Sequence, residues 1–343
     1  MLSLSGVVKA VGPYGGYKLA STLTQRYPRI LMYHRFSVEG TNGAISKRVL
    51  ERQFAYLKDH FEVLSLTEAL NRCSPSRSRS GRSKPIVTIT IDDGYRDFYE
   101  ICFPLLKKYR FPATFYVATD FVGDGIWLWH DKLKWIIENS VDISEPLSIG
   151  GVEYSPEYWR ENKEKLWFEL VSAMLKIPGQ DINDLLERIS FLTNVQPPKS
   201  PIEQYRSVSW SELREMQNNG VSVGGHTKDH FSLGHLSEGG VRDQVIGCRD
   251  HLSHELGDLG RHFCFPNGQP SDITDFSKME VKNAGFESAV AAYYDRNGIS
   301  DRFSLSRHGV GENWFEFLKS VWGVDRLGAQ LLNRDNKFDW GDV

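Results

Sequence analysis

The chain of 343 residues is long enough for one large α/β domain or two smaller ones. Its 40% hydrophobic and 25% charged residues are ordinary for a globular protein, and its formal net charge of −3 argues against a nucleic-acid binder, which is usually basic. No run of about 18 apolar residues occurs, so no transmembrane helix is expected.

The cysteines and the first residues of the chain bear on its location. The four cysteines are scattered and form no C-x-x-C pair, which fits a reducing compartment better than a secreted protein. Residues 1–23 are mildly apolar, but glycines interrupt them and their first charge, Lys9, follows the first apolar run, unlike a signal peptide. We therefore expect a cytoplasmic protein, and a peripheral membrane contact through this segment is the alternative.

Predicted strands and helices alternate between residues 29 and 118. Residues 29–36, RILMYHRF, predict a buried strand, and residues 85–91, PIVTITI, predict a β-branched strand covered on both faces. The other expected elements are helices at residues 49–58, at 66–72 with Thr67 as its N-cap, and after the second strand as far as 109, and a strand at 112–118. This order contains a βαβ unit of a parallel sheet.

Residues 127–206 interrupt the alternation. Five of the nine tryptophans fall among helical runs that Pro-Gly and Pro-Pro pairs punctuate, so we interpret this segment as a mainly helical insertion. Strands then return at residues 220–225, 261–265, 286–292 and 302–310, with helices between them.

Seven strands that alternate with helices predict an α/β fold, a distorted and incomplete (β/α) seven-stranded barrel over residues 29–310. We expect an N-terminal segment at 1–28 before it and a C-terminal helical tail at 311–343 after it. Such barrels carry their chemistry at the C-terminal ends of the strands.

An acidic pair, Asp92 and Asp93, directly follows the strand at 85–91 and precedes Gly94. Neighbouring side chains on a strand point to opposite faces, so both carboxylates line one pocket only where the backbone turns, which Gly94 permits. An acidic D-D-G turn without a chemical role is the alternative.

Two histidines, His226 and His230, follow the strand at 220–225. On a helix or helical turn this spacing places two imidazoles on one face, about 5–6 Å apart at Cβ, where they can bind one metal ion. A catalytic site takes three protein ligands, so one aspartate of the acidic pair would complete the set and the other would accept a proton from water. Two surface histidines in a polar loop are the alternative.

Taken together, these motifs resemble those of the polysaccharide deacetylases of carbohydrate esterase family four, the NodB-homology group. The family motif T-F-D-D-G is similar to residues 90–94, TIDDG, and the motif H-[S/T]-x-x-H to residues 226–230, HTKDH. The stretches LMYHR at 31–35 and DGYRD at 93–97 also resemble longer members of the group. The third motif, R-P-P-Y-G, corresponds to residues 263–268, FCFPNG, where its arginine is missing, and the last motif, L-x-x-H, to residues 305–308, LSRH.

The resemblance implies a metal site and a catalytic base. Asp93, His226 and His230 would bind a divalent metal, and Asp92 would be the base that activates water. The metal would be zinc, which two nitrogens and one oxygen suit on chemical grounds, with cobalt, nickel and manganese as alternatives.

The acid that protonates the leaving amine has two candidates, first His308 and then His34, because the pKa of histidine lies near neutrality. Arg307 or Arg96 would replace the missing arginine beside Asp92, with a surface salt bridge as the alternative for either residue. The residues expected to bind substrate are Tyr95, Trp210, Phe265, Pro266, Asn267 and Gly268, with ordinary core packing as the alternative for the three aromatic residues.

The function that the resemblance implies is removal of an N-acyl group, with acetyl as the first choice, from an amino sugar of a surface polysaccharide or its precursor. One alternative keeps the same core and acts as a deformylase or another amide hydrolase. The second alternative is a catalytically inactive carbohydrate-binding protein, since a fold alone does not establish activity.

Overall fold

The computed structural model describes residues 15–25, 27–40, 43–73, 84–123, 125–257, 260–294, 301–332 and 336–337. The first fourteen residues of the expected N-terminal segment therefore lie outside the described residues. The strands of the main sheet are β1 (Arg29–Tyr33), β4 (Glu62–Val63), β5 (Ile86–Ile91), β6 (Ala113–Val117), β9 (Val221–Gly225), β10 (His262–Cys264), β11 (Ser288–Val290) and β13 (His308–Gly309).

The main sheet confirms the predicted barrel. Its strand order is β11-β10-β9-β6-β5-β1-β13, with β4 paired to β5, and every pair is parallel. The central strands β1, β5 and β6 are buried along their whole length, as their apolar and β-branched residues require when helices cover the outer face. The C-terminal ends of these strands lie at one edge, where the predicted site residues follow.

The last segment of the barrel brings the two ends of the sheet together. The predicted strand at 302–310 is reduced to β13, which pairs with β1, and to a single bridge between Leu305 and Val290 of β11. The barrel is incomplete because only this short segment joins the two edges. It carries Arg307 between its two points of pairing.

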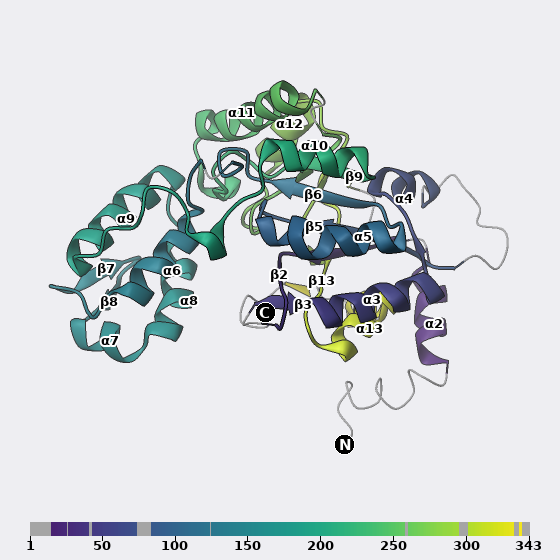
Figure 1. The fold of residues 1–343 in the computed structure, drawn as a ribbon, viewed down its shortest axis with the longest axis horizontal. Coiled ribbons are helices and arrows are strands. Elements are labelled where there is room, and N and C mark those ends of the chain that lie inside the picture. Colours follow the sequence, from purple (N-terminus) through teal and green to yellow (C-terminus); the bar gives the residue numbers. More distant parts are fainter. Residues whose placement is uncertain are drawn as a thin grey trace, which may run out of the picture.

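Helices surround the sheet in the predicted order (Figure 1). They are α3 (Lys47–His60), α4 (Leu66–Arg72), the π-helical turn η2 (Phe98–Cys102), α5 (Phe103–Tyr109), α10 (Trp210–Asn218), α11 (Glu238–Leu256) and α12 (Asp275–Asn283), with 3-10 turns η3 (Glu203–Tyr205) and η4 (Leu233–His235). The N-cap of α4 is Ser65 rather than Thr67, because Ser65 and Glu68 form a capping box. Two short pairs complete this part, β2 (Arg35–Ser37) with β3 (Ala44–Ser46) and β12 (Tyr293–Tyr294) with β14 (Asn336–Lys337).

The insertion forms a separate lobe beside the barrel (Figure 1). Its helices are α6 (Trp129–Asn139), α7 (Pro156–Glu161), α8 (Lys163–Met174) and α9 (Gly179–Thr193). A hairpin of β7 (Leu147–Ile149) and β8 (Val152–Tyr154), which the sequence did not predict, packs with them. The lobe has its own hydrophobic core around Trp159, Leu170 and Leu186.

The two ends of the described chain pack together. Helix α2 (Gly16–Leu23) contacts α13 (Trp314–Trp322) and α14 (Val324–Leu332), and α13 also contacts β1. Among the residues described, no helix is both long and apolar enough to cross a membrane.

Candidate active site

The acidic pair stands at the C-terminal end of β5. The amide of Asp92 continues the sheet by donating to Tyr33 O at 3.1 Å, and the chain then turns through positive φ at Asp93 (81°) and Gly94 (113°). An aspartate tolerates this left-handed region better than most residues, and glycine adopts it freely. The turn directs both carboxylates into the barrel, where both are almost fully buried.

The two histidines come from the loop that follows β9, and not from a helix as the spacing suggested. Thr227 (φ 64°) and His230 (φ 63°) take left-handed conformations, and the amide of His230 donates to Thr227 Oγ1 at 3.0 Å. The resulting tight turn brings the two imidazole rings to 4.8 Å between centroids. A glycine is required just before it, because a Cβ on Gly224 would lie 2.5 Å from His262 O.

Asp93 and the two histidines converge on one point. Asp93 Oδ1 lies 3.3 Å from His226 Nε2 and 3.2 Å from His230 Nε2, and the three ligand atoms lie within 4.8 Å of one another. Nδ1 of His226 is 2.8 Å from Cys264 O, which can only accept, so Nδ1 carries a proton and Nε2 is the nitrogen that faces Asp93.

This arrangement fits a divalent metal. A lone pair that faces a buried carboxylate is repelled unless a proton or a metal cation lies between them. Burial alone would raise the pKa of Asp93, but hydrogen bonds with His226 and His230 hold it well below its usual range, so the carboxylate is ionised. Two imidazoles and one carboxylate are also the donor set of many catalytic zinc sites.

Arg307 holds the second carboxylate of the site, Asp92. Its Nη1 and Nη2 donate to Asp92 Oδ1 and Oδ2 at 2.7 Å each, and neither side chain is more than 3% exposed. Burial would raise the pKa of Asp92, but the Arg307 guanidinium outweighs it and lowers that pKa. Arg96, the other candidate, is partly exposed and pairs instead with Glu100 and Glu212.

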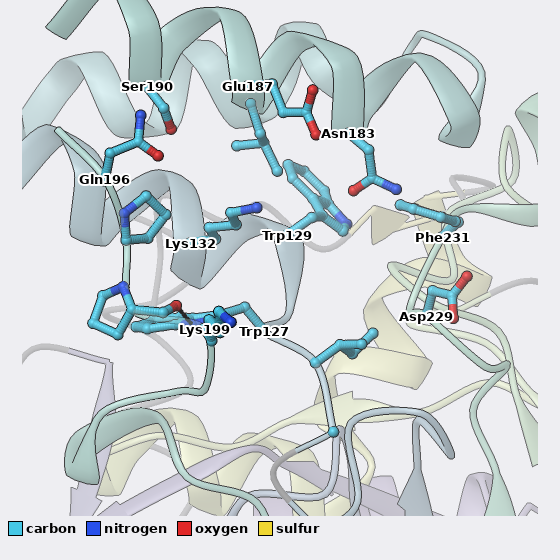
Figure 2. A pocket seen from close by; sticks show the side chains of 15 residues that line it. Trp127, Trp129, Lys132, Asn183, Glu187, Ser190, Gln196, Lys199, Asp229 and Phe231 are labelled. Carbon is cyan, nitrogen blue, oxygen red and sulfur yellow. Dashed lines mark hydrogen bonds between the residues drawn. The ribbon is translucent and has the colours of Figure 1, made fainter. Parts of the chain in front are cut away.

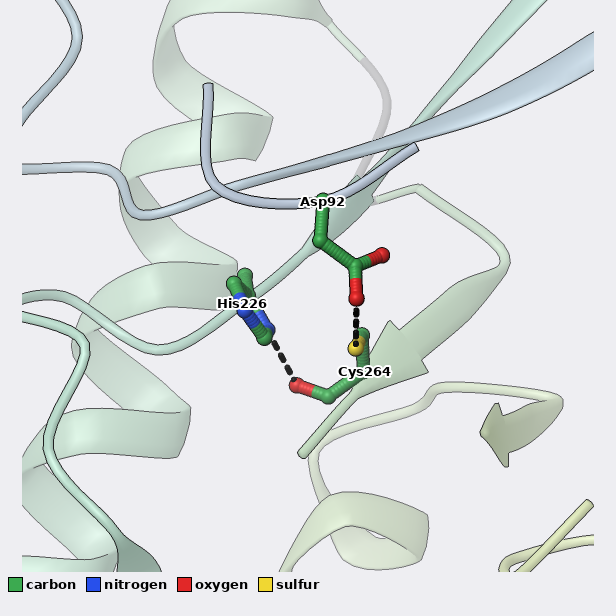
Figure 3. Close-up of side chains that lie close together, drawn as sticks. All are labelled: Asp92, His226 and Cys264. Atoms are coloured by element: carbon green, nitrogen blue, oxygen red, sulfur yellow. Dashed lines mark hydrogen bonds between the residues drawn. The ribbon is translucent and has the colours of Figure 1, made fainter. Parts of the chain in front are cut away.

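A cysteine completes the surroundings of Asp92 (Figure 3). The Cys264 thiol lies 3.5 Å from Asp92 Oδ2, and Arg307 Nη2 lies 3.1 Å from its sulfur. Burial raises the pKa of Cys264 well above its usual value, so the thiol is neutral and can donate to the carboxylate. Asp92, His226 and Cys264 also lie close enough for a metal, but the positive charge of Arg307, which contacts both Asp92 and Cys264, disfavours a cation there.

The two candidates for the acid lie in different places. His34 Nε2 is 3.7 Å from Asp92 Oδ2, and the His34 side chain is 20% exposed. His308 follows Arg307 in extended chain and therefore points the opposite way, out of the barrel, where burial and the charges of Arg326 and Arg29 lower its pKa to about 3. The structure thus places His34, and not His308, at the site.

The residues expected to bind substrate are mostly buried. Phe265 is 1% exposed and packs against Phe263 in the core, so it offers no face to a sugar. Trp210 begins α10 and contacts His251. Tyr95 lies nearer the site but is also buried, and its hydroxyl donates to Asp131 Oδ2 at 2.5 Å.

The loop of residues 266–268 is fixed by close packing. Pro266 is buried, Asn267 (φ 57°) is partly exposed, and Gly268 takes φ 59°. A Cβ on Gly268 would lie 2.7 Å from Ala292 N, so this glycine permits the close approach of the loop to the chain after β11. Asn267 is partly exposed as a residue, but its side-chain Nδ2 is buried and has no hydrogen-bond partner among the described residues.

The insertion contributes His130, to which the sequence had assigned no role. His130 of α6 places its ring 5.2 Å from that of His230, and its Nε2 is 3.3 Å from the Tyr95 hydroxyl. The indole of Trp129 donates to His230 O at 3.3 Å. The W-L-W-H-D run at the start of the insertion was the available signal, but only the fold shows that it meets the histidine loop.

Comparisons with known proteins agree with this geometry. Residues 79–145 and 187–289 match the family described as polysaccharide deacetylase. Over 118 residues, 32% of the chain, the sequence is 31% identical to the poly-beta-1,6-N-acetyl-D-glucosamine N-deacetylase of Staphylococcus aureus. The chain spans about two fifths of the length of the curated relatives it matches.

Solved structures show the same fold. IcaB from Ammonifex degensii superposes with a TM-score of 0.56 at 18% identity, covering 87% of this chain and 97% of that one. The Streptococcus pyogenes deacetylase PplD, in complex with acetate, superposes with a TM-score of 0.54 at 18% identity, covering 88% and 97%.

Proposed function

The chain belongs to the polysaccharide deacetylase family, and from that premise we propose that it hydrolyses the N-acetyl group of an amino sugar in a polysaccharide or its precursor. The observation that carries the proposal is the pairing of two differently held carboxylates. Asp93 faces two histidines, whereas Asp92, the preceding residue, is held by the guanidinium of Arg307. Metal-assisted amide hydrolysis needs one carboxylate that helps to hold the metal and a second that takes a proton from water.

Asp93, His226 and His230 would hold the metal. Their two nitrogens and one oxygen favour zinc, with cobalt, nickel and manganese as further candidates. When bound, a divalent metal supplies Lewis-acid polarisation of a carbonyl oxygen and makes water more acidic.

Asp92 is the base in this proposal. Its lowered pKa keeps it ionised, and the fork of Arg307 fixes its orientation toward the site. It takes a proton from the water whose oxygen attacks the amide carbon. The C–N bond then breaks, and the products are acetate and the free amine.

His34 is the acid in this proposal. Burial lowers its pKa, which makes the protonated imidazole a stronger acid toward a departing amine. At 3.7 Å from Asp92 it lies close to the group that has received the proton of the water. The residue is also partly exposed, as a group that meets substrate must be.

For the substrate we take the printed name of the staphylococcal relative as the guide and propose a polymer of N-acetylglucosamine. For the location we propose the cytoplasm, because all four cysteines are free and buried, which is compatible with a reducing compartment. Cell fractionation tests this second point.

A substrate panel tests the activity. The purified protein is stripped with a chelator, zinc, cobalt, nickel and manganese are restored one at a time, and acid release is measured from N-acetyl and N-formyl amino sugars and from non-sugar amides. Acetate released only with metal supports the proposal. Formate alone indicates a deformylase, and binding of sugars without any hydrolysis indicates a carbohydrate-binding protein.

A further inference from the structure

A cavity of about 660 Å³ lies between the insertion and the barrel (Figure 2). We call it the insertion groove. Residues that line it include Trp127, Trp129 and Lys132 at the start of the insertion, Asn183 and Glu187 of α9, and Asp229 of the loop after β9. Its volume is within the range of about 300–1,000 Å³ that is usual for small-molecule sites.

The insertion groove shares a wall with the predicted metal site. Asp229 and Phe231 line the groove, and His230 between them turns its imidazole to Asp93. Trp129, another lining residue, donates its indole N–H to His230 O at 3.3 Å. A molecule in the groove is therefore separated from the metal site by the thickness of one loop.

The lining of the groove suits a neutral molecule rich in hydroxyl groups. Lys132 and Lys199 supply two positive charges, and Glu187 and Asp229 supply two negative ones, so the lining has no net charge to select an ion. Amide and hydroxyl side chains add donors and acceptors without charge, namely Asn183, Ser190 and Gln196. Figure 2 shows Asn183 and Glu187 beside the indole of Trp129.

Trp127 and Trp129 are buried and reach the groove with only part of their indoles, and Pro197, Pro198 and Phe231 add further apolar walls among these polar groups. A sugar ring has both kinds of surface, C–H groups that pack against an aromatic wall and hydroxyls that need several hydrogen-bond partners. Ligand sites combine apolar walls with a few fixed polar groups in this way. A purely apolar ligand would leave the charged and amide groups without partners.

We propose that the insertion groove binds a neutral sugar unit of the polymer, next to the unit that is deacetylated. The inference rests on the proposed function for the identity of the polymer. It assigns the insertion a task that the barrel cannot perform, because helices α6 and α9 together with the loops of the insertion supply most of the lining. The protein then selects chains over single sugars.

The test measures binding to metal-free protein by calorimetry, with a dimer and a hexamer of β-1,6-linked N-acetylglucosamine as probes. Wild-type protein is expected to bind the hexamer at least about tenfold more tightly than the dimer, a difference of about 1.4 kcal/mol. The double variant Asn183→Ala/Glu187→Ala is expected to lose this preference. Both positions are exposed on α9, where alanine favours the helix, so the variant keeps its fold.

The matched control is Asp184→Ala/Arg188→Ala, on exposed positions of the same helix that do not line the groove. It is expected to bind both probes like the wild type. Equal binding of dimer and hexamer by wild-type protein, or an unchanged preference in Asn183→Ala/Glu187→Ala, overturns the proposal.

Acetate release separates this inference from the proposed function. If metal-loaded protein releases acetate but the double variant keeps its preference for the hexamer, the groove inference alone fails. If no acetate is released from any probe while the preference for the hexamer depends on Asn183 and Glu187, the inference about the groove is supported and the proposed activity fails.

Discussion

Replacing Arg307 with methionine removes the fork that holds Asp92 and leaves a carboxylate that is only 3% exposed without its main partner. Breaking a buried ion pair from one side costs about 3–5 kcal/mol of unfolding free energy. The guanidinium is also the main cause that lowers the pKa of Asp92 against the effect of burial, so this pKa rises in the variant. A base with a raised pKa is protonated at higher pH, and the acid limb of kcat/KM moves upward in pH.

Urea unfolding of metal-free protein and a pH profile of acetate release measure the two effects. Arg96→Met is the control, because Arg96 and its nearer partner Glu100 are partly solvent-exposed and such a pair is worth about 0.2–1 kcal/mol. Arg307→Lys, which keeps the charge but loses the fork, provides a second variant in case Arg307→Met does not fold. If the acid limb of kcat/KM lies at the same pH in both Arg307 variants as in wild-type protein, Arg307 does not set the pKa of Asp92 and its assigned role is refuted.

The remaining predictions concern the histidines and the metal. His34→Gln should lower kcat by about 10²–10⁴-fold, as expected for loss of an acid, whereas His308→Gln should leave kcat nearly unchanged; equal losses in steady-state assays would contradict the assignment. The pKa of folded His308 is about 3 and that of an unfolded histidine about 6.5, so the unfolded state binds one more proton between these values. His308 therefore stabilises the fold fully above about pH 6.5 and loses this contribution as pH falls toward 3, by about 1.4 kcal/mol per unit. In denaturant titrations at several pH values, the unfolding free energy of His308→Gln should fall less steeply between about pH 6.5 and 3 than that of wild-type protein. An equally steep fall in both would count against the buried neutral ring. Zinc at about 100 times its Kd should raise the unfolding free energy by about 2.7 kcal/mol in wild-type protein and by much less in Asp93→Asn, and an equal rise in both would show that zinc binds elsewhere.

The sequence predicts the parts of the fold that depend on local pattern. The apolar and β-branched run of β5 and the run of β6 mark central strands of a parallel sheet, and the acidic pair follows the first of them directly. The residues that the resemblance identifies as metal ligands also come together as expected. Local pattern failed for β7 and β8, which are three residues each and too short to show alternation.

Contacts between distant residues could not be predicted in the same way. Arg307 and Asp92 are 215 positions apart, and only closure of the barrel by the segment after β11 brings them together. His34 lies beside Asp92 and His308 does not, because consecutive residues of extended chain point opposite ways and Arg307 takes the inward position. The histidine loop was expected to be helical because spacing alone does not reveal left-handed residues such as Thr227.

The central claim is that adjacent aspartates have different tasks, and one comparison tests it most directly. Asp92→Asn and Asp93→Asn are loaded with zinc beside wild-type protein, and bound zinc and acetate release from the N-acetylglucosamine hexamer are measured on the same samples. The structure predicts that Asp92→Asn retains zinc but releases no acetate, and that Asp93→Asn loses both. Zinc lost from Asp92→Asn and kept by Asp93→Asn, or acetate released by Asp92→Asn at the wild-type rate, would contradict the account.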